Sequence, residues 1–180
     1  MASTDINGFI LRNYRKALVV PAIFLVVAAA CKISYSFSGA SISPQVKTLS
    51  VQRFFNRAAL VQPGLDQTLT DALIDMCRAQ TSLEIVSSLG DVDFEGEITD
   101  YKTQPVTVAA DAYAAMNRFT ITVHVKFTNT IDPNLSFDQS FSRYEDYDGD
   151  VDLSSVEQEL SDRILDMIVE DIFNRAFVNW

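Results

Sequence analysis

The most suggestive chemistry in the sequence lies in an acidic stretch, Asp146–Asp152, in which carboxylates recur at every second position. Counted from Asp146, they stand at positions 1, 3, 5 and 7, and Glu157 stands at position 12, close to the ligand spacing of an EF-hand calcium loop. That loop needs glycine at position 6, where this chain has Val151. We therefore expect a solvated strand-to-helix connection whose acids favour the positive end of the next helix, with a calcium loop as the alternative.

The sequence offers few residues for nucleophilic catalysis or for metal binding. His124 is the single histidine, so a Ser-His or Cys-His pair, or a site with several histidines, has at most one candidate. We expect His124 on the polar side of a strand, between Thr122 and Lys126, facing solvent. The sequence contains no G-x-S-x-G, no H-E-x-x-H and no glycine-rich phosphate loop. We expect no enzyme activity, no metal site and no cofactor.

Basic side chains are the remaining candidates for a binding surface. Arg118 and Lys126 fall on the polar side of one alternating segment, and we expect Arg53, Arg57 and Arg143 to join them on a polar sheet face. Arginine binds phosphate with two parallel hydrogen bonds, so this face could dock an anionic glycolipid headgroup or a polar protein wall. The alternative is a sheet face that is only solvated.

Composition limits the class of protein. The chain has 180 residues, 48% hydrophobic and 21% charged, which is typical of one globular domain. Lys plus Arg is 14 against 24 Asp plus Glu, so the formal net charge is -10. Such an acidic chain is not suited to holding a nucleic-acid backbone, and we expect no nucleic-acid partner.

The first 30 residues have the pattern of an export signal. A basic stretch, Arg12–Lys16, precedes the apolar residues 17–30, and three alanines lead directly into Cys31. The apolar run is shorter than the roughly 20 residues that span a membrane, which disfavours the alternative of a transmembrane anchor. The junction resembles a bacterial lipobox, so we expect cleavage between Ala30 and Cys31 and a lipid on Cys31. The alternative is ordinary cleavage with Cys31 as a free thiol.

The remaining chain divides into a tether and one domain. Residues 31–45 are rich in serine and predict a lipidated N-terminus followed by an extended tether, and residues 46–180 predict a single domain. If Cys31 carries lipid, Cys77 is the one cysteine left, so no intramolecular disulfide can form. Cys77 falls on the apolar side of a predicted helix, where we expect it to be buried.

Hydrophobic periodicity predicts the elements of that domain. We expect a strand at Val46–Phe54, a loop at Phe55–Pro63, a helix from Pro63-Gly64 through Cys77, strands at Val92–Thr99, Arg118–Phe127 and Leu135–Tyr144, and a helix capped by Ser154 and Glu157 that runs almost to Trp180. Leu83–Val86 is either the end of the first helix or a small strand. This order predicts an α+β two-layer sandwich, in which one mostly antiparallel sheet carries two amphipathic helices on one face.

Several short strings, taken in order, resemble the LptE-like lipoproteins of Bacteroidota over essentially the whole mature chain. The strings are Tyr35–Gly39, Val46–Phe54 followed by Asn56–Ala58, Phe94–Ile98, Asn117–Val123, Phe137–Arg143 and Glu170–Arg175. None of them is a catalytic signature, and the family has no catalytic residues to carry over.

The resemblance implies an outer-membrane lipoprotein subunit of the lipopolysaccharide transport and assembly complex. Such a subunit plugs the β-barrel LptD and aids insertion of lipopolysaccharide into the outer leaflet. The segment after Cys31, Lys32–Tyr35, lacks the acidic run of surface-exposed lipoproteins, which favours the periplasmic face. The partners implied are an LptD-like barrel, lipopolysaccharide, and the membrane through the N-terminal lipid. The alternative is a periplasmic lipoprotein that binds a ligand or partner unrelated to lipopolysaccharide export.

Overall fold

The computed structural model of the chain describes residues 42–60, 62–106 and 115–178. All of these belong to one compact unit, residues 38–180. The predictions for the signal segment, for Ala30 and Cys31, and for most of the tether fall on residues outside this description. No helix within the described ranges combines the length and the apolar character needed to cross a membrane.

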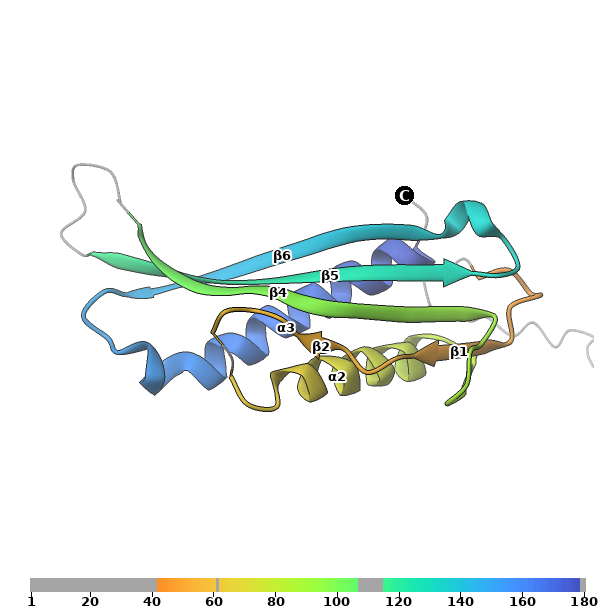
Figure 1. Cartoon of the computed structure of the whole chain (residues 1–180), viewed down its shortest axis with the longest axis horizontal. Coiled ribbons are helices and arrows are strands. Elements are labelled where there is room, and N and C mark those ends of the chain that lie inside the picture. Colours follow the sequence, from red (N-terminus) through yellow and green to blue (C-terminus); the bar gives the residue numbers. More distant parts are fainter. Residues whose placement is uncertain (1–41, 61, 107–114, 179–180) are drawn as a thin grey trace, which may run out of the picture. The chain divides into compact units, whose positions relative to one another are not determined.

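The described residues form one sheet of six strands and two long helices (Figure 1). In chain order the elements are β1 (Thr48–Val51), β2 (Phe55–Asn56), α2 (Leu65–Gln80), β3 (Glu84–Ile85), β4 (Val92–Val106), β5 (Met116–Asn129), the 3-10 helix η1 (Pro133–Leu135), β6 (Phe137–Asp148) and α3 (Leu153–Phe177). The strand order is β3-β1-β4-β5-β6, and β2 also pairs with β4. The predicted α+β fold, with its sheet and two helices, is confirmed.

Two antiparallel ladders make up most of the sheet. Strand β4 pairs with β5 from Val92 opposite Asn129 to Val106 opposite Met116, and β5 pairs with β6 along the whole of β6. Strands β1, β2 and β3 are short and join the sheet in parallel. Two of the long strands extend past their predicted ends, since β4 continues to Val106 and β6 continues to Asp148. The predicted loop at Phe55–Pro63 contains the short strand β2, and Leu83–Val86 contains the short strand β3.

A β-bulge at Thr99 changes the phase of side-chain alternation in β4. Ile98 lies opposite Val123 and Asp100 lies opposite Thr122, so Thr99 has no partner residue in β5. An extra residue in one strand moves all later side chains to the other face relative to strict alternation. Because of it, Tyr101 is buried on the same side as Ile98 instead of facing the opposite side.

Both helices pack on one face of the sheet, as their apolar stripes predict. In α2 the buried residues include Leu65, Leu69, Leu73 and Cys77, and the predicted burial of Cys77 is confirmed. Burial raises the pKa of the Cys77 thiol to about 12, which makes it an unreactive small apolar group.

The start of α3 differs from the predicted capping box. Asp152, not Ser154, is the N-cap, and its carboxylate accepts a hydrogen bond from the backbone N–H of Ser154 at 2.9 Å. Aspartate and serine cap helices about equally well, so the N-cap is simply the residue that immediately precedes the helix, which here is Asp152. Glu157 is therefore not the second half of a box and instead accepts a hydrogen bond from the Tyr101 hydroxyl at 2.5 Å.

Aromatic side chains join the strands to the end of α3. The rings of Phe94 and Phe127 lie 4.7 Å apart on neighbouring strands, and Phe177 meets Phe94 edge-on at 5.9 Å. Phe54, fully buried, lies over Gly96, where an added Cβ would come within 2.7 Å of its ring. The same Cβ would also clash with the carbonyl oxygen of His124 in β5, so glycine at position 96 is required by both neighbours.

We predict that Thr70→Val lowers the free energy of unfolding by about 1–3 kcal/mol, because it leaves a buried backbone donor without its acceptor. The Thr70 hydroxyl accepts a hydrogen bond from the backbone N–H of Phe54 at 3.1 Å and donates to the carbonyl of Asp66 at 2.7 Å. Urea unfolding measures the change.

Thr68→Val is the matched control. Thr68 also donates to the carbonyl one turn earlier, that of Gly64, at 3.2 Å, but it is exposed and accepts nothing from another segment. It should change the unfolding free energy by a few tenths of a kcal/mol. Equal destabilisation by the two variants would show that the Phe54 contact contributes nothing.

Candidate functional site on the open face of the sheet

The face of the sheet opposite the helices is lined by polar side chains. Along β5 the residues on this open face are those predicted from alternation: Arg118, Thr120, Thr122, His124 and Lys126. Their partly exposed side chains alternate with fully buried apolar residues that face the helices. The predicted polar surface therefore exists and extends across three long strands.

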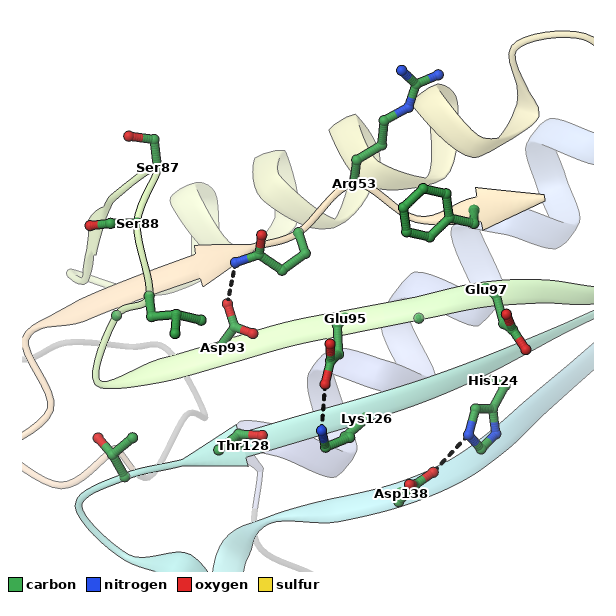
Figure 2. A pocket seen from close by; sticks show the side chains of 16 residues that line it. Arg53, Ser87, Ser88, Asp93, Glu95, Glu97, His124, Lys126, Thr128 and Asp138 are labelled. Atoms are coloured by element: carbon green, nitrogen blue, oxygen red, sulfur yellow. Dashed lines mark hydrogen bonds and ion pairs between the residues drawn. The ribbon is translucent and has the colours of Figure 1, made fainter. Parts of the chain in front are cut away.

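A hollow of about 1030 Å³ lies on this open face (Figure 2). Charged residues from β4, β5 and β6 form its floor, and two exposed apolar side chains, Phe55 from β2 and Leu89 from the loop before β4, border it. Phe55 is 59% exposed and Leu89 is 77% exposed. The lining polar residues that Figure 2 labels are Arg53, Ser87, Ser88, Asp93, Glu95, Glu97, His124, Lys126, Thr128 and Asp138.

Side-chain contacts between neighbouring strands fix the polar groups on the floor of the hollow. The Lys126 ammonium donates to Glu95 at 2.5 Å, and this hydrogen bond raises the pKa of Lys126. His124 Nε2 lies 2.7 Å from Asp138, and its Nδ1 lies 3.3 Å from the Ser140 hydroxyl. His124 is thus half-exposed in a strand-to-strand contact, as the sequence predicts for a residue on the polar face.

Arg118 is held by a two-point ion pair and by an aromatic ring. Its Nε and Nη2 atoms donate to the two oxygens of Asp146 at 2.8 and 2.9 Å, and its guanidinium lies 3.6 Å from the centre of the Tyr144 ring. The hydrogen bond raises the pKa of Arg118 and lowers that of Asp146. These contacts hold the guanidinium group at one place on the open face of the sheet.

Two further candidates lie at the border of this face. Arg53 pairs with Asp66 at the start of α2 at 2.9 Å, and the pKa of Asp66 is lowered mainly by this hydrogen bond. Arg57 lies 3.7 Å from Glu97, an open-face residue, and above the ring of Phe55.

Arg143 lies on the other face, contrary to the prediction. It pairs with Ile121 across the sheet, on the helix-covered side, and donates to both oxygens of Asp171 in α3 at 2.6 Å. The reason is strand periodicity: Arg143 is two residues after the buried Phe141 and so shares its face.

Each of the five predicted cations is thus paired with a carboxylate. An anionic ligand on the open face must share these cations with their acids or displace the acids. Uncharged polar ligands, or a polar protein surface, meet no such competition, since hydroxyl, amide and carboxylate groups remain available as donors and acceptors.

The acidic stretch does not form an EF-hand arrangement. Asp146 and Asp148 belong to β6, Asp146 is occupied by Arg118, and Asp152 caps α3. Within the described ranges no three His, Cys, Asp or Glu side chains are grouped as metal ligands.

The sequence did not single out Phe55 and Leu89. Both lie in segments whose apolar residues show no period, so no pattern assigns them to a face. Asp93 lies on the open face of β4 but is only 7% exposed, and its carboxylate accepts hydrogen bonds from Ser50 and Gln52.

The fold and its open face define a small α+β domain whose sheet is covered by two helices on one side and by paired charges on the other. A family model described as LptE, lipopolysaccharide-assembly, matches residues 46–176. The chain belongs to this family, which confirms the resemblance and assigns the chain to lipopolysaccharide assembly in the cell envelope. No curated protein sequence matches the chain.

Solved structures with a similar fold include three bacterial lipoproteins. A minor lipoprotein from Acinetobacter baumannii is 12% identical, covers 72% of this chain and 91% of its own, and has a TM-score of 0.47. Rare lipoprotein B from Shewanella oneidensis is 11% identical, with coverage of 72% and 90% and a TM-score of 0.46. A lipoprotein B from Nitrosomonas europaea is 10% identical, with coverage of 71% and 79% and a TM-score of 0.46. Likeness at this level says nothing about the function of this chain.

We predict that Arg118→Gln raises the pKa of the Asp146 carboxyl toward its ordinary value of 3.8, because the hydrogen bond from Arg118 is the main cause of its lowering. A carboxyl whose folded pKa is lowered adds stability above the unfolded pKa and loses it as pH falls. The stability difference between wild type and variant should therefore shrink below about pH 3.8.

Carbon NMR titration of the aspartate carboxyls measures this pKa directly. Arg143→Gln is the control, since Arg143 contacts Asp171 on the opposite face and should leave the titration of Asp146 unchanged. An Asp146 pKa that stays low in Arg118→Gln would mean that another group holds it.

Proposed function

We propose that the chain is an outer-membrane lipoprotein subunit of the lipopolysaccharide transport complex, that it plugs an LptD-like β-barrel, and that it aids insertion of lipopolysaccharide into the outer leaflet. The observation that carries this proposal is the match of the lipopolysaccharide-assembly family model to residues 46–176. In this proposal the anchor is a lipid on Cys31, exposed by removal of residues 1–30, and it holds the chain on the periplasmic face. The subunit acts by binding and not by catalysis.

The two faces of the sheet support a plug. One face is sealed by α2 and α3, so the core of the domain needs no partner to cover it. The open face carries hydrogen-bonding groups and matched ion pairs. Each charged side chain that lines the hollow has a polar partner, so placing this face against a polar lumen leaves none of them without a hydrogen bond or ion pair.

The cations of the open face are the proposed contacts with lipopolysaccharide. Arg118 uses Nε and Nη2 for Asp146, which leaves its Nη1 group as a donor for a phosphate oxygen. Lys126 and Arg57 lie on the same face beside Glu95 and Glu97. Arg53 borders the hollow, whereas Arg143 contacts α3 and would reach a ligand only from the helix side.

Extraction of the outer membrane in mild detergent, followed by purification through a C-terminal tag and mass spectrometry, tests the partner and the anchor together. We expect an LptD-like barrel in equal amount, and an N-terminal peptide that begins with acylated Cys31.

The opposite result has a clear meaning. Recovery of the chain alone, in a detergent that keeps other barrel complexes intact, would contradict the plug and favour a binding module unrelated to lipopolysaccharide export. An unmodified Cys31 with the barrel present would contradict the lipid anchor and leave the plug standing.

We predict that Arg118→Glu combined with Lys126→Glu weakens binding of purified lipopolysaccharide about tenfold or more, because two phosphate contacts are replaced by repulsion. Binding is measured with the full chain in detergent. Arg78→Glu, an exposed charge reversal on α2, is the control for net charge. It lowers the net charge by two units, against four for the double variant, and should bind nearly like wild type because Arg78 lies outside the open face. Unchanged binding by the open-face double variant would exclude this face as the lipopolysaccharide contact.

A further inference from the structure

The outer edge of β6 is a long strand edge with no partner among the described residues. Strand β6 pairs with β5 on one side over its 12 residues, and the sheet ends there. The opposite border of the sheet ends in β3, which has 2 residues. Strand β6 contains no proline or glycine, and its ladder with β5 has no bulge. A regular edge of this length is a template for another strand, and such edges are usually shortened, bulged or covered.

The hydrogen bonds at the ends of β5 show which residues of β6 face outward. Thr130 donates its backbone N–H to Asp91, so even-numbered residues of β5 point their backbone groups toward β4. Gly149 donates to the carbonyl of Ala115, so odd-numbered residues of β5 point toward β6. Antiparallel pairing alternates strictly.

It follows that odd-numbered residues of β6 bond to β5 and even-numbered residues point away from it. The outward-pointing residues are Asp138, Ser140, Ser142, Tyr144, Asp146 and Asp148, of which Asp148 already accepts a hydrogen bond from the backbone N–H of Val151. The side chains of these same residues lie on the open face, where Asp138 and Asp146 are already paired with His124 and Arg118. The edge therefore offers five residues whose backbone N–H and C=O groups both lack a partner among the described residues. The side chains of Asp138, Ser140, Ser142 and Asp146 are hydrogen-bonded within the open face.

A second copy of this chain is the occupant that the side chains of β6 fit. An antiparallel pair centred on Phe141 places Ser140 opposite Ser142 of the second copy and Asp138 opposite its Tyr144. On the helix side it places Gln139 opposite Arg143 and the two Phe141 rings next to each other. No like charges meet.

Neighbouring registers fit less well. A pair centred on Ser142 places Asp138 opposite Asp146 of the second copy, and a pair centred on Arg143 places two guanidinium groups together. Like charges directly opposite each other destabilise a strand pair. A pair centred on Ser140 opposes no like charges but joins fewer residues of the strand.

We propose that two copies of the free chain join edge to edge through β6, antiparallel and about a two-fold axis at Phe141, so that the two sheets become one. In this register four outward-pointing residues of each copy form hydrogen-bonded pairs, which gives about eight backbone hydrogen bonds. The contact is isologous, as in most symmetric dimers. Figure 1 shows β6 at the border of the sheet and α3 behind the sheet, so in this view the helix does not lie over the outer edge of β6. The proposal concerns the free chain and does not depend on the barrel.

A charge swap at two exposed positions tests both the contact and its register. Ser140→Lys with Ser142→Lys places lysine opposite lysine twice across the two-fold axis. Ser140→Lys with Ser142→Glu places lysine opposite glutamate twice. Both variants lose the same hydroxyl contacts with His124 and Thr122, so they are matched for those contacts and differ in the sign of the pairing. The Lys/Lys variant is also two units more positive than the Lys/Glu variant, which lowers the overall repulsion between two acidic chains and works against the weaker dimer expected of it. Circular dichroism confirms that both retain the wild-type fold.

Sedimentation of the full chain in mild detergent measures the dimer dissociation constant. We expect wild type and the Lys/Glu variant to dimerise with similar constants, and the Lys/Lys variant to dimerise at least about tenfold more weakly. A wild-type chain that stays monomeric overturns the proposal. This holds whether the backbone amides of β6 exchange hydrogen freely with solvent or are protected by another segment of the chain. Equal dimerisation of the two variants overturns it as well, because the contact must then lie elsewhere on the chain.

Discussion

The phase of side-chain alternation along β4 and β5 is the constraint on which the rest of this domain depends. Up to Ile98 the even-numbered residues of β4 face the helices, and β5 opposes them with its odd-numbered residues. Strict alternation would send Tyr101 to the open face and bring Asp100 into the core. The unpaired Thr99 resets the phase, so that one strand of 15 residues keeps a dry face and a wet face along its whole length.

That separation explains the electrostatics of the open face. The strands place Lys126 opposite Glu95 and Arg118 opposite Asp146, and each pair forms an ion pair. His124 contacts Asp138 diagonally, since its direct partner in β6 is Ser140. An acidic chain thus carries a sheet face on which its few cations are all matched. Exposed pairs of this kind contribute little stability, but they fix the positions of their side chains and keep the surface compatible with polar surroundings.

The sequence predicts those parts in which period and burial agree. The apolar stripe of α2, the alternation in β5 and the burial of Cys77 are read directly from residue spacing, and with them the two-layer fold and the polar face. Features that depend on tertiary contacts are not encoded in a local pattern. Strand β2 exists because β4 offers it an edge, and the bulge at Thr99 is decided by registry with β5. Arg143 is a different case, because its spacing from Phe141 already places it on the helix side.

The topology also bears on the order in which the domain can assemble. Strands β4, β5 and β6 follow one another directly, so each pairs with a near neighbour in sequence. Leu49 of β1, by contrast, pairs with Val92, and the intervening chain contains the whole of α2. Pairing strands that are far apart in sequence is slow, because the entropy cost of closing the loop comes before the contacts that stabilise it. A ribosome delivers the N-terminal half first, so β1 and α2 emerge before the strand that receives them has been made. The first third of the domain therefore has no sheet to pack against until β4, β5 and β6 have been synthesised, and its apolar residues stay exposed to other molecules during that time.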